Sequence, residues 1–259
     1  MEIVTLTNQK GGVAKTTTSY ALGVGLYNAG KRVLLVDVDA QSNLSFTAGV
    51  DLNNLQTSLY DVFKGKADIK DAIQPLRVGL DIVTSGIEMA GADMEFIGIG
   101  RESILSEQLE KIKSNYDFCI IDTPPTLGVL TMNALTASDK AIIPLCADAY
   151  SIQGVTQLNK FITSIQKHYN SNLRVAGLLL TKYNSRTVIS QMLQDNIKTA
   201  ADMLKTNVYD TKIRSTVSVT ESQLAREDIY TNAPTATATE DYKAFVNEFL
   251  ELKHHHHDY

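Results

Sequence analysis

The segment that decides the fold is Asn8-Gln9-Lys10-Gly11-Gly12-Val13-Ala14-Lys15-Thr16-Thr17-Thr18. It follows an apolar run, Ile3–Thr7, and leads into a helix-like stretch, Lys15–Asn28. A strand, a glycine-containing loop and a helix in this order are typical of a phosphate-binding loop, which usually reads G-x-x-x-x-G-K-[ST]. If Lys15 and Thr16 end the loop, its two glycine positions fall on Gln9 and Ala14, so the usual pattern is not met.

The part of the pattern that remains is still suited to a phosphate. Backbone N–H groups of residues 11 to 16 can surround an anion, and the positive end of the following helix adds to the attraction. Lys15 can reach the β- and γ-phosphates of a nucleotide, and the Thr16 hydroxyl can hold Mg²⁺. The sequence therefore predicts a site for ATP and Mg²⁺. The expected nucleotide-binding residues are Lys10, Gly11, Gly12, Val13, Ala14, Lys15, Thr16 and Thr17.

Apolar runs alternate with helix-like stretches along the whole chain. The candidate strands are Ile3–Thr7, Val33–Val38, Leu80–Thr84, Phe118–Asp122, Ala141–Leu145 and Val175–Leu180. The candidate helices between them include Lys15–Asn28, Glu102–Ser114, Ile152–His168 and Thr187–Leu204. Several strands are continuous runs of Val, Ile and Leu, as in parallel strands that are covered on both faces. We therefore predict an α/β fold, a doubly wound and mostly parallel sheet with helices on both faces, in one domain over residues 1–253.

The last candidate helix, Thr239–Lys253, carries one apolar stripe. Its members are Tyr242, Phe245, Val246, Phe249 and Leu250. The polar face is mostly acidic, whereas a helix that lies on a membrane usually carries Lys and Arg there. We therefore expect the stripe to pack onto the sheet. The His-rich tail, residues 254–259, is either a remnant of a purification tag or native, and we assign it no role.

Composition excludes several classes of protein. No apolar run approaches the roughly 18 residues that span a bilayer, and the N-terminus has no signal-peptide pattern, so a cytoplasmic protein is expected. The two cysteines, Cys119 and Cys146, lie in apolar runs without C-x-x-C spacing. Neither a zinc site nor a dithiol redox centre is therefore expected.

Charge is distributed unevenly along the chain. The net charge of −5 argues against a general nucleic-acid binder. Residues 160–226, however, hold ten Lys or Arg against four Asp or Glu, an excess of +6, which leaves −11 for the rest of the chain. Such asymmetry suggests a basic face directed at an anionic partner, although a chance fluctuation on a solvated surface explains it equally well.

Three motifs together resemble the ParA/Soj family of partition ATPases, whose phosphate loop is a deviant Walker A motif. They are residues 8–18 above, then Arg32-Val33-Leu34-Leu35-Val36-Asp37-Val38-Asp39-Ala40-Gln41, and Asp117-Phe118-Cys119-Ile120-Ile121-Asp122-Thr123-Pro124-Pro125. Further segments, at residues 133–139 and 154–158, extend the likeness over nearly the whole chain. The family usually has Gly where this chain has Ala14. We expect Ala14 to be tolerated only with a negative φ, because a left-handed backbone favours glycine.

The resemblance implies roles for individual residues. Lys10 is similar to the family's signature lysine, which reaches the nucleotide of a partner subunit, and Asp39 matches a carboxylate implicated in hydrolysis. Asp122 matches the Walker B carboxylate near Mg²⁺. The catalytic residues implied are thus Lys10, Lys15 and Asp39, and the metal-site residues are Thr16 and Asp122. Asp37 is expected to act only as an N-cap or a loop hydrogen bonder.

The resemblance also implies a partner surface. Short members of the family bind duplex DNA nonspecifically through basic residues of the C-terminal half, and this chain, which begins at its first strand, is similar to them. Arg186 matches a family arginine of this kind. Residues 213–221 resemble a family loop rich in arginine, in which Ser215 and Ser218 stand where related proteins often carry Arg and Arg214 is expected to compensate. No base-reading motif is present, so contacts to phosphates are expected.

The resulting hypothesis is a DNA-segregation ATPase. Its ATP-dependent homodimer binds nucleoid DNA, and a ParB-like centromere-binding protein stimulates hydrolysis and release. Two alternatives remain: a MinD-like positioning ATPase at a membrane, which the acidic last helix disfavours, and a metabolic ATP-dependent ligase of the same fold. The cargo is not encoded in any motif.

Overall fold

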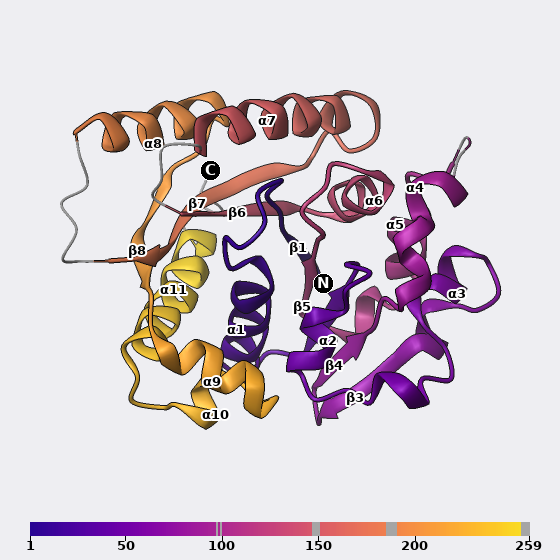
Figure 1. Cartoon of the computed structure of the whole chain (residues 1–259). Helices are drawn as coiled ribbons and strands as arrows, with labels where there is room; N and C mark the ends of the chain where they lie inside the picture. Colours follow the sequence, from indigo (N-terminus) through magenta and orange to yellow (C-terminus); the bar gives the residue numbers. More distant parts are fainter. Residues whose placement is uncertain (97, 99, 147–150, 185–190, 255–259) are drawn as a thin grey trace.

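The computed structural model describes residues 1–96, 98, 100–146, 151–184 and 191–254. One eight-stranded sheet, ordered β3-β4-β2-β5-β1-β6-β7-β8, runs through the molecule (Figure 1). Its strands are β1 Glu2–Leu6, β2 Val33–Asp37, β3 Ile73–Arg77, β4 Leu80–Val83, β5 Phe118–Asp122, β6 Lys140–Cys146, β7 Arg174–Tyr183 and β8 Val208–Arg214. All neighbouring pairs are parallel except β3 and β4. The carboxyl ends of seven strands therefore meet at one edge of the sheet.

Helices cover both faces of the sheet, as predicted. The α-helices of the described residues are α1 Lys15–Asn28, α2 Asn43–Thr47, α3 Leu59–Phe63, α4 Ala92–Glu95, α5 Ile104–Glu110, α6 Val129–Ala137, α7 Ser151–His168, α8 Gln191–Met203, α9 Val217–Ala225, α10 Ile229–Asn232 and α11 Thr237–His254. Short 3-10 helices lie at Leu52–Asn54, Ile69–Ala72, Ile87–Gly91 and Lys113–Asn115. None of the helices described is both long and apolar enough to cross a membrane.

The hydrophobic core lies in layers on the two faces. One layer joins α1 and α11 to the sheet, and the predicted stripe of α11 is in it, with Tyr242 and Phe245 fully buried. On the opposite face, a second layer packs α5 and α6 against β2 and β5, and a third packs α7 and α8 against β6 and β7. Figure 1 shows α7 and α8 along one side of the sheet and α1 and α11 along the other. This arrangement confirms the doubly wound architecture.

Two edge strands were absent from the sequence prediction. β3 contains Pro75, which cannot donate to a sheet, and none of its residues is fully buried. β8 alternates buried and exposed residues and contains Asp210 and Lys212. Neither strand has the continuous apolar run that marked the interior strands, because one edge of each is not covered by another strand. The predicted helix 102–114 is shorter in the structure, where α5 ends at Glu110.

The free edge of β8 is occupied by side chains of α11. The Glu248 carboxylate accepts hydrogen bonds from the backbone N–H groups of Asp210 and Thr211, at 2.7 and 3.0 Å. Four residues further along β8, the N–H of Arg214 donates to Asp241 Oδ2 at 2.9 Å. Helix α11 thus satisfies backbone donors that no further strand pairs.

Candidate functional site

The loop between β1 and α1 is held in place by the neighbouring strands. Thr181 Oγ1, on β7, donates to the Val13 carbonyl oxygen at 3.0 Å, and Asn8 Nδ2 donates to the Pro144 carbonyl on β6 at 2.8 Å. Val13 is fully buried, whereas Gly11 and Gly12 are exposed. A Cβ added at either glycine would meet no atom within 4 Å, so the space above the loop is open.

Ala14 corrects one expectation from the sequence. It adopts φ 63° and ψ 30°, in the left-handed region, where a negative φ was predicted. Ala14 is the N-cap of α1, and no side chain caps this helix. The turn from loop to helix therefore requires the left-handed conformation even without glycine, at a cost of about 1 kcal/mol. It aims the uncapped N–H groups of the first helical turn at the open space above the loop.

Lys15 lies inside the loop rather than in solvent. Its side chain is 7% exposed, and its Nζ donates to the Lys10 carbonyl oxygen at 3.2 Å. Desolvation lowers the pKa of Lys15, and the nearby carboxylates of Asp122 and Asp39 oppose that shift. A cation held in such surroundings interacts strongly with an incoming anion, because little water screens it.

Thr16 and Asp122 bring two hard oxygen donors together beneath the loop. Thr16 Oγ1 donates to Asp122 Oδ2 at 2.6 Å, and Ser19 Oγ donates to Asp122 Oδ1 at 2.9 Å. Burial raises the pKa of Asp122, while these hydrogen bonds and Lys15 oppose the rise. A hydroxyl and a carboxylate fit Mg²⁺, which takes few protein oxygens and completes its shell with water and phosphate. Sequence reasoning missed Ser19, which carries no motif signal.

The two aspartates after β2 differ in their surroundings. Asp37 is fully buried next to Asp122 on the neighbouring strand and accepts hydrogen bonds from Ser45 N and Oγ, at 2.9 and 2.8 Å. Burial, together with the Asp122 carboxylate, raises the pKa of Asp37. Asp39 is half-buried, and its Oδ1 accepts from Gln41 N at 3.0 Å. Asp37 is thus the hydrogen bonder that the sequence predicted, and Asp39 faces the open groove.

A groove of about 700 Å³ unites these residues at the carboxyl ends of the strands. Its floor contains the phosphate loop and Asp39, and its far wall is formed by residues 213–224 with Tyr242 of α11. The volume is within the range of small-molecule sites, and this edge is where open α/β sheets bind ligands. The structure therefore brings together, in or beside one groove, the predicted residues Gly11, Gly12, Ala14, Lys15, Thr16, Thr17, Asp39 and Asp122.

The far wall is tied to α1 by contacts that the sequence did not reveal. Gln223 Nε2, on α9, donates to Thr17 Oγ1 at 2.9 Å, and the hydroxyls of Tyr242 and Thr18 lie 3.2 Å apart. Tyr242 was predicted only as a member of an apolar stripe, and Gln223 stands in no motif. Both bonds join residues more than 200 positions apart, so no local pattern could indicate them.

The residues predicted to contact DNA have different outcomes. Arg186 lies outside the described residues. Arg214 lines the groove, but its guanidinium forms an ion pair with Asp241, Nη2 to Oδ1, at 2.6 Å. Other basic residues of this half are exposed: Lys160, Lys167, Arg174, Lys182, Lys198, Lys205 and Lys212.

Comparison with known proteins finds relatives over most of the chain. A family model described as "AAA domain" matches residues 1–175. The sporulation initiation inhibitor protein Soj of Bacillus subtilis is 39% identical over 249 residues, covering 95% of this chain and 97% of Soj. The chromosome partitioning protein ParA of Caulobacter vibrioides is 36% identical over 226 residues, covering 86% and 84%.

A solved structure extends the comparison to three dimensions. Cobyrinic acid a,c-diamide synthase from Mycobacterium smegmatis, with bound ADP and magnesium, superposes with a TM-score of 0.83 at 33% identity. The match covers 96% of this chain and 94% of that one. The sequence relatives match nearly the full length of the chain, and the solved structure has the same fold. Both findings agree with the deviant phosphate loop of residues 10–16. The chain belongs to the ParA/Soj family of P-loop ATPases.

Proposed function

We propose that the chain is a Mg²⁺-dependent partition ATPase, built as one domain over residues 1–253 and working in the cytoplasm on the nucleoid. Its ATP-bound dimer binds duplex DNA nonspecifically, and a ParB-like partner stimulates hydrolysis and release. The observation that carries the proposal is the group of Lys15, Thr16 and Asp122 at the base of an open groove. The similarity to Soj and ParA over most of the chain supports partition as the use of this activity.

The groove residues have distinct roles in this proposal. Lys15 neutralises charge on the β- and γ-phosphates, while N–H groups of residues 11 to 16 surround them. Thr16 and Asp122 hold Mg²⁺, which, when bound, neutralises charge on the phosphate oxygens. Asp39, on the open side of the groove, orients the attacking water. Lys10 reaches the nucleotide of a second copy and so makes ATP a ligand that favours the dimer.

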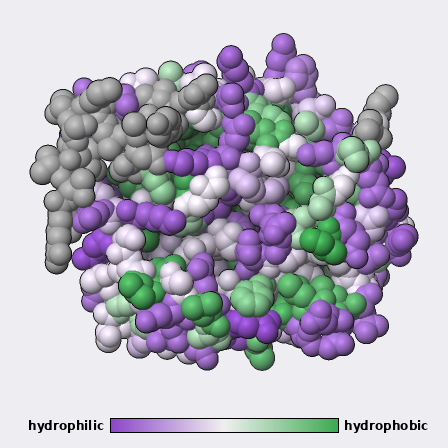
Figure 2. Space-filling model, in the orientation of Figure 1, coloured by the Kyte–Doolittle hydropathy of each residue, from purple (hydrophilic) through white to green (hydrophobic). Residues whose placement is uncertain are grey.

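Exposed apolar side chains beside the groove suit contact with a second copy. Phe46 on α2 is 46% exposed, and Leu224 and Val217 on α9 are 77% and 72% exposed. Phe46 and Leu224 also line the groove. Figure 2 shows separate green patches in the lower half of the molecule, where α2 and α9 lie in Figure 1. Burial of such side chains stabilises association.

The DNA surface is the basic half of the chain. Exposed cations lie on α7, on α8 and in the turn that follows α8, including Lys160, Lys167, Lys198 and Lys205. Arg186 is proposed to join them. Each neutralised phosphate adds about −0.9 to the slope of log affinity against log salt, so a dimer has a steeper slope than a monomer.

The test is the affinity for mixed-sequence duplex DNA with Mg-ATP and with Mg-ADP, across a salt titration. We expect tight, salt-sensitive binding with ATP only. Lys10→Ala should keep monomer ATP affinity and lose both ATP-dependent dimerisation and DNA binding. Equal DNA affinity in ATP and ADP would contradict the ATP switch.

A ligase is the second candidate, because the Mycobacterium smegmatis relative is a diamide synthase of similar sequence and fold. Turnover that requires a small carboxylate substrate, and not DNA with a partner protein, would favour it. A membrane role is less suited to this chain, because the apolar stripe of α11 is buried against the sheet. Co-sedimentation with liposomes tests that alternative.

A further inference from the structure

Arg214 ends β8, and both its backbone and its side chain contact one carboxylate. Its N–H and its Nε each donate to Asp241 Oδ2 at 2.9 Å, and its Nη2 donates to Asp241 Oδ1 at 2.6 Å. Nη2 also lies 3.4 Å from the carbonyl oxygen of Thr237, in the first turn of α11. The Asp241 side chain is only 11% exposed. These bonds fix the direction in which the chain leaves β8, because they hold backbone and side chain at once.

The segment that follows Arg214 forms most of the far wall of the groove. Ser215, Thr216 and Val219 line it, and Ser215 N donates to the Tyr183 carbonyl oxygen at 3.0 Å. The wall is held again at its other end, where Gln223 donates to Thr17 of α1. Tyr242, next to Asp241 in sequence, meets Thr18 on the same helix. The Arg214–Asp241 pair is therefore one of several attachments, within the described residues, that hold the wall above the phosphate loop.

The same contacts leave Arg214 poorly suited to a DNA phosphate. Its positive charge is compensated by a carboxylate that is almost buried, and several of its N–H donors point to that carboxylate and to Thr237. Breaking the pair to reach DNA would leave Asp241 desolvated without its cation, which is unfavourable.

We propose that Arg214 is a positioning residue of the nucleotide site, which acts with Asp241 to hold the wall formed by residues 215–223, and that it does not contact DNA. The inference rests on the proposed function of the groove as the ATP site. It predicts that nucleotide affinity, and not the number of DNA phosphates contacted, depends on this pair.

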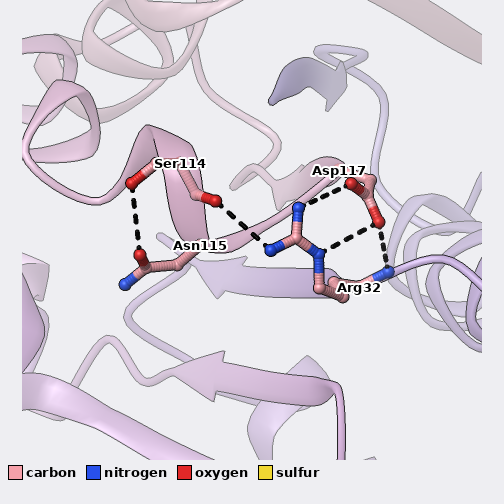
Figure 3. Close-up of polar contacts among 4 residues, drawn as sticks. All are labelled: Arg32, Ser114, Asn115 and Asp117. Carbon is pink, nitrogen blue, oxygen red and sulfur yellow. Dashed lines mark hydrogen bonds and ion pairs between the residues drawn. The ribbon is translucent and has the colours of Figure 1, made fainter.

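The chain contains a matched control. Arg32, just before β2, forms a similar pair with Asp117 (Figure 3). Its N–H and Nε donate to Asp117 Oδ2 at 2.8 and 3.3 Å, and its Nη2 donates to Oδ1 at 2.8 Å. This pair lies at the amino ends of β2 and β5, away from the groove. A variant that lacks this pair shows what the loss of an Arg–Asp ion pair does when the pair does not lie at the groove.

The experiment measures affinity for a fluorescent ATP analogue with Mg²⁺ in Arg214→Ala, Asp241→Ala and the double variant, with Arg32→Ala as control. We expect each groove variant to bind about tenfold more weakly, and the double variant to bind no worse than either, because the two residues act as one unit. Arg32→Ala should bind as the wild type does. Arg214→Lys, which keeps the charge but not the planar fork, should recover only part of the affinity.

A second readout separates positioning from DNA contact. At saturating ATP, the salt slope of DNA binding should be the same in wild type, Arg214→Ala and Arg214→Lys. Unchanged ATP affinity together with a flatter salt slope in Arg214→Ala would overturn the inference, as would additive losses in the double variant. If Arg214→Ala does not fold, Arg214→Lys gives the same comparison. Failure of the wild-type chain to bind the ATP analogue would instead refute the proposed function.

Discussion

The two ends of the parallel strands hold their charges in different ways. At the amino ends, Arg32 pairs with Asp117, and Lys140 pairs with Glu2 at 2.9 Å, each cation beside one anion. At the carboxyl ends, Asp37 and Asp122 are fully buried side by side, and Lys15 is 7% exposed. Two neighbouring buried carboxylates lower the stability of the folded state. Each loses its hydration, and their negative charges repel one another. The amino end is thus arranged for stability and the carboxyl end for a ligand.

The two Arg–Asp pairs make the same contrast at the level of single residues. Arg32 and Asp117 are 53% and 38% exposed, whereas Arg214 and Asp241 are 39% and 11% exposed. Figure 3 shows how Arg32 also reaches the carbonyl oxygen of Ser114, within the turn before β5. Similar contacts therefore join two strands at one end and, in our proposal, align a wall of the groove at the other.

The largest effect is expected from Lys15→Ala. The variant should bind Mg-ATP at least about 100-fold more weakly, because a desolvated cation that meets phosphate is worth roughly 3 kcal/mol. Titration with a fluorescent ATP analogue measures this. Arg32→Ala, at the opposite end of the strands, should leave the affinity unchanged. Equal affinity in Lys15→Ala and wild type would contradict the assignment of residues 10–17 as the nucleotide-binding loop.

Asp39→Ala should separate binding from turnover. It should bind ATP and dimerise but hydrolyse roughly 100-fold more slowly, since we expect Asp39 to orient water and not to hold phosphate. Size-exclusion chromatography with multi-angle scattering should then detect a persistent ATP dimer. A monomer in ATP, or turnover at the wild-type rate, contradicts this role.

Asp117→Asn tests how the Arg32–Asp117 pair, at the amino ends of the strands, contributes to folding stability at different pH values. Hydrogen bonds from Arg32 lower the pKa of Asp117 to about 2. The pair therefore stabilises the fold above the unfolded pKa of about 4 and loses that contribution as the pH falls towards 2. Because the pair is exposed, the variant should lose less than about 1 kcal/mol at pH 7, and the gap should narrow below pH 4. Urea unfolding at several pH values measures it. A gap that widens in acid would contradict the assignment.

The smallest effect is expected from Ala14→Gly. Glycine removes the left-handed strain of about 1 kcal/mol but adds unfolded-state entropy of similar size, so stability should change by less than about 0.5 kcal/mol. ATP affinity should stay within about twofold of wild type. Thermal unfolding and nucleotide titration decide it, and a tenfold change in affinity would show that the methyl group itself shapes the loop.

The sequence predicted the candidate site residues that lie on short local motifs. Lys15, Thr16 and Asp122 could be found because a loop–helix junction and the end of an apolar strand are local patterns. The predicted φ of Ala14 was wrong, because the tertiary bonds at Val13 and Asn8 that fix the loop override the preference of alanine for a negative φ. Interior strands were found from their apolar runs, whereas β3 and β8 lack such runs.

The far wall of the groove could not be predicted from the sequence. Its place in a basic region, in a segment that resembles an arginine-rich family loop, predicts a DNA contact for Arg214, whereas Asp241 is one of several acids on the polar face of α11. Their pairing depends on how α11 crosses β8, which is a property of the whole fold. The basic excess of residues 160–226 remains a prediction about DNA, carried by the exposed lysines.

The side chains of α11 that occupy the edge of β8 have a consequence for how copies of this chain can associate. An unpaired strand edge is a template for another strand, and it leads to open-ended stacking of sheets or to aggregation. Here Glu248 and Asp241 already accept the hydrogen bonds of Asp210, Thr211 and Arg214. An incoming strand would have to displace two carboxylates and leave them beside its own carbonyl oxygens.

At the other edge of the sheet, Pro75 of β3 has no N–H that could donate to an incoming strand. Both borders of the sheet therefore resist intermolecular strand pairing, which favours reversible contact through the faces of the molecule over irreversible growth along the sheet.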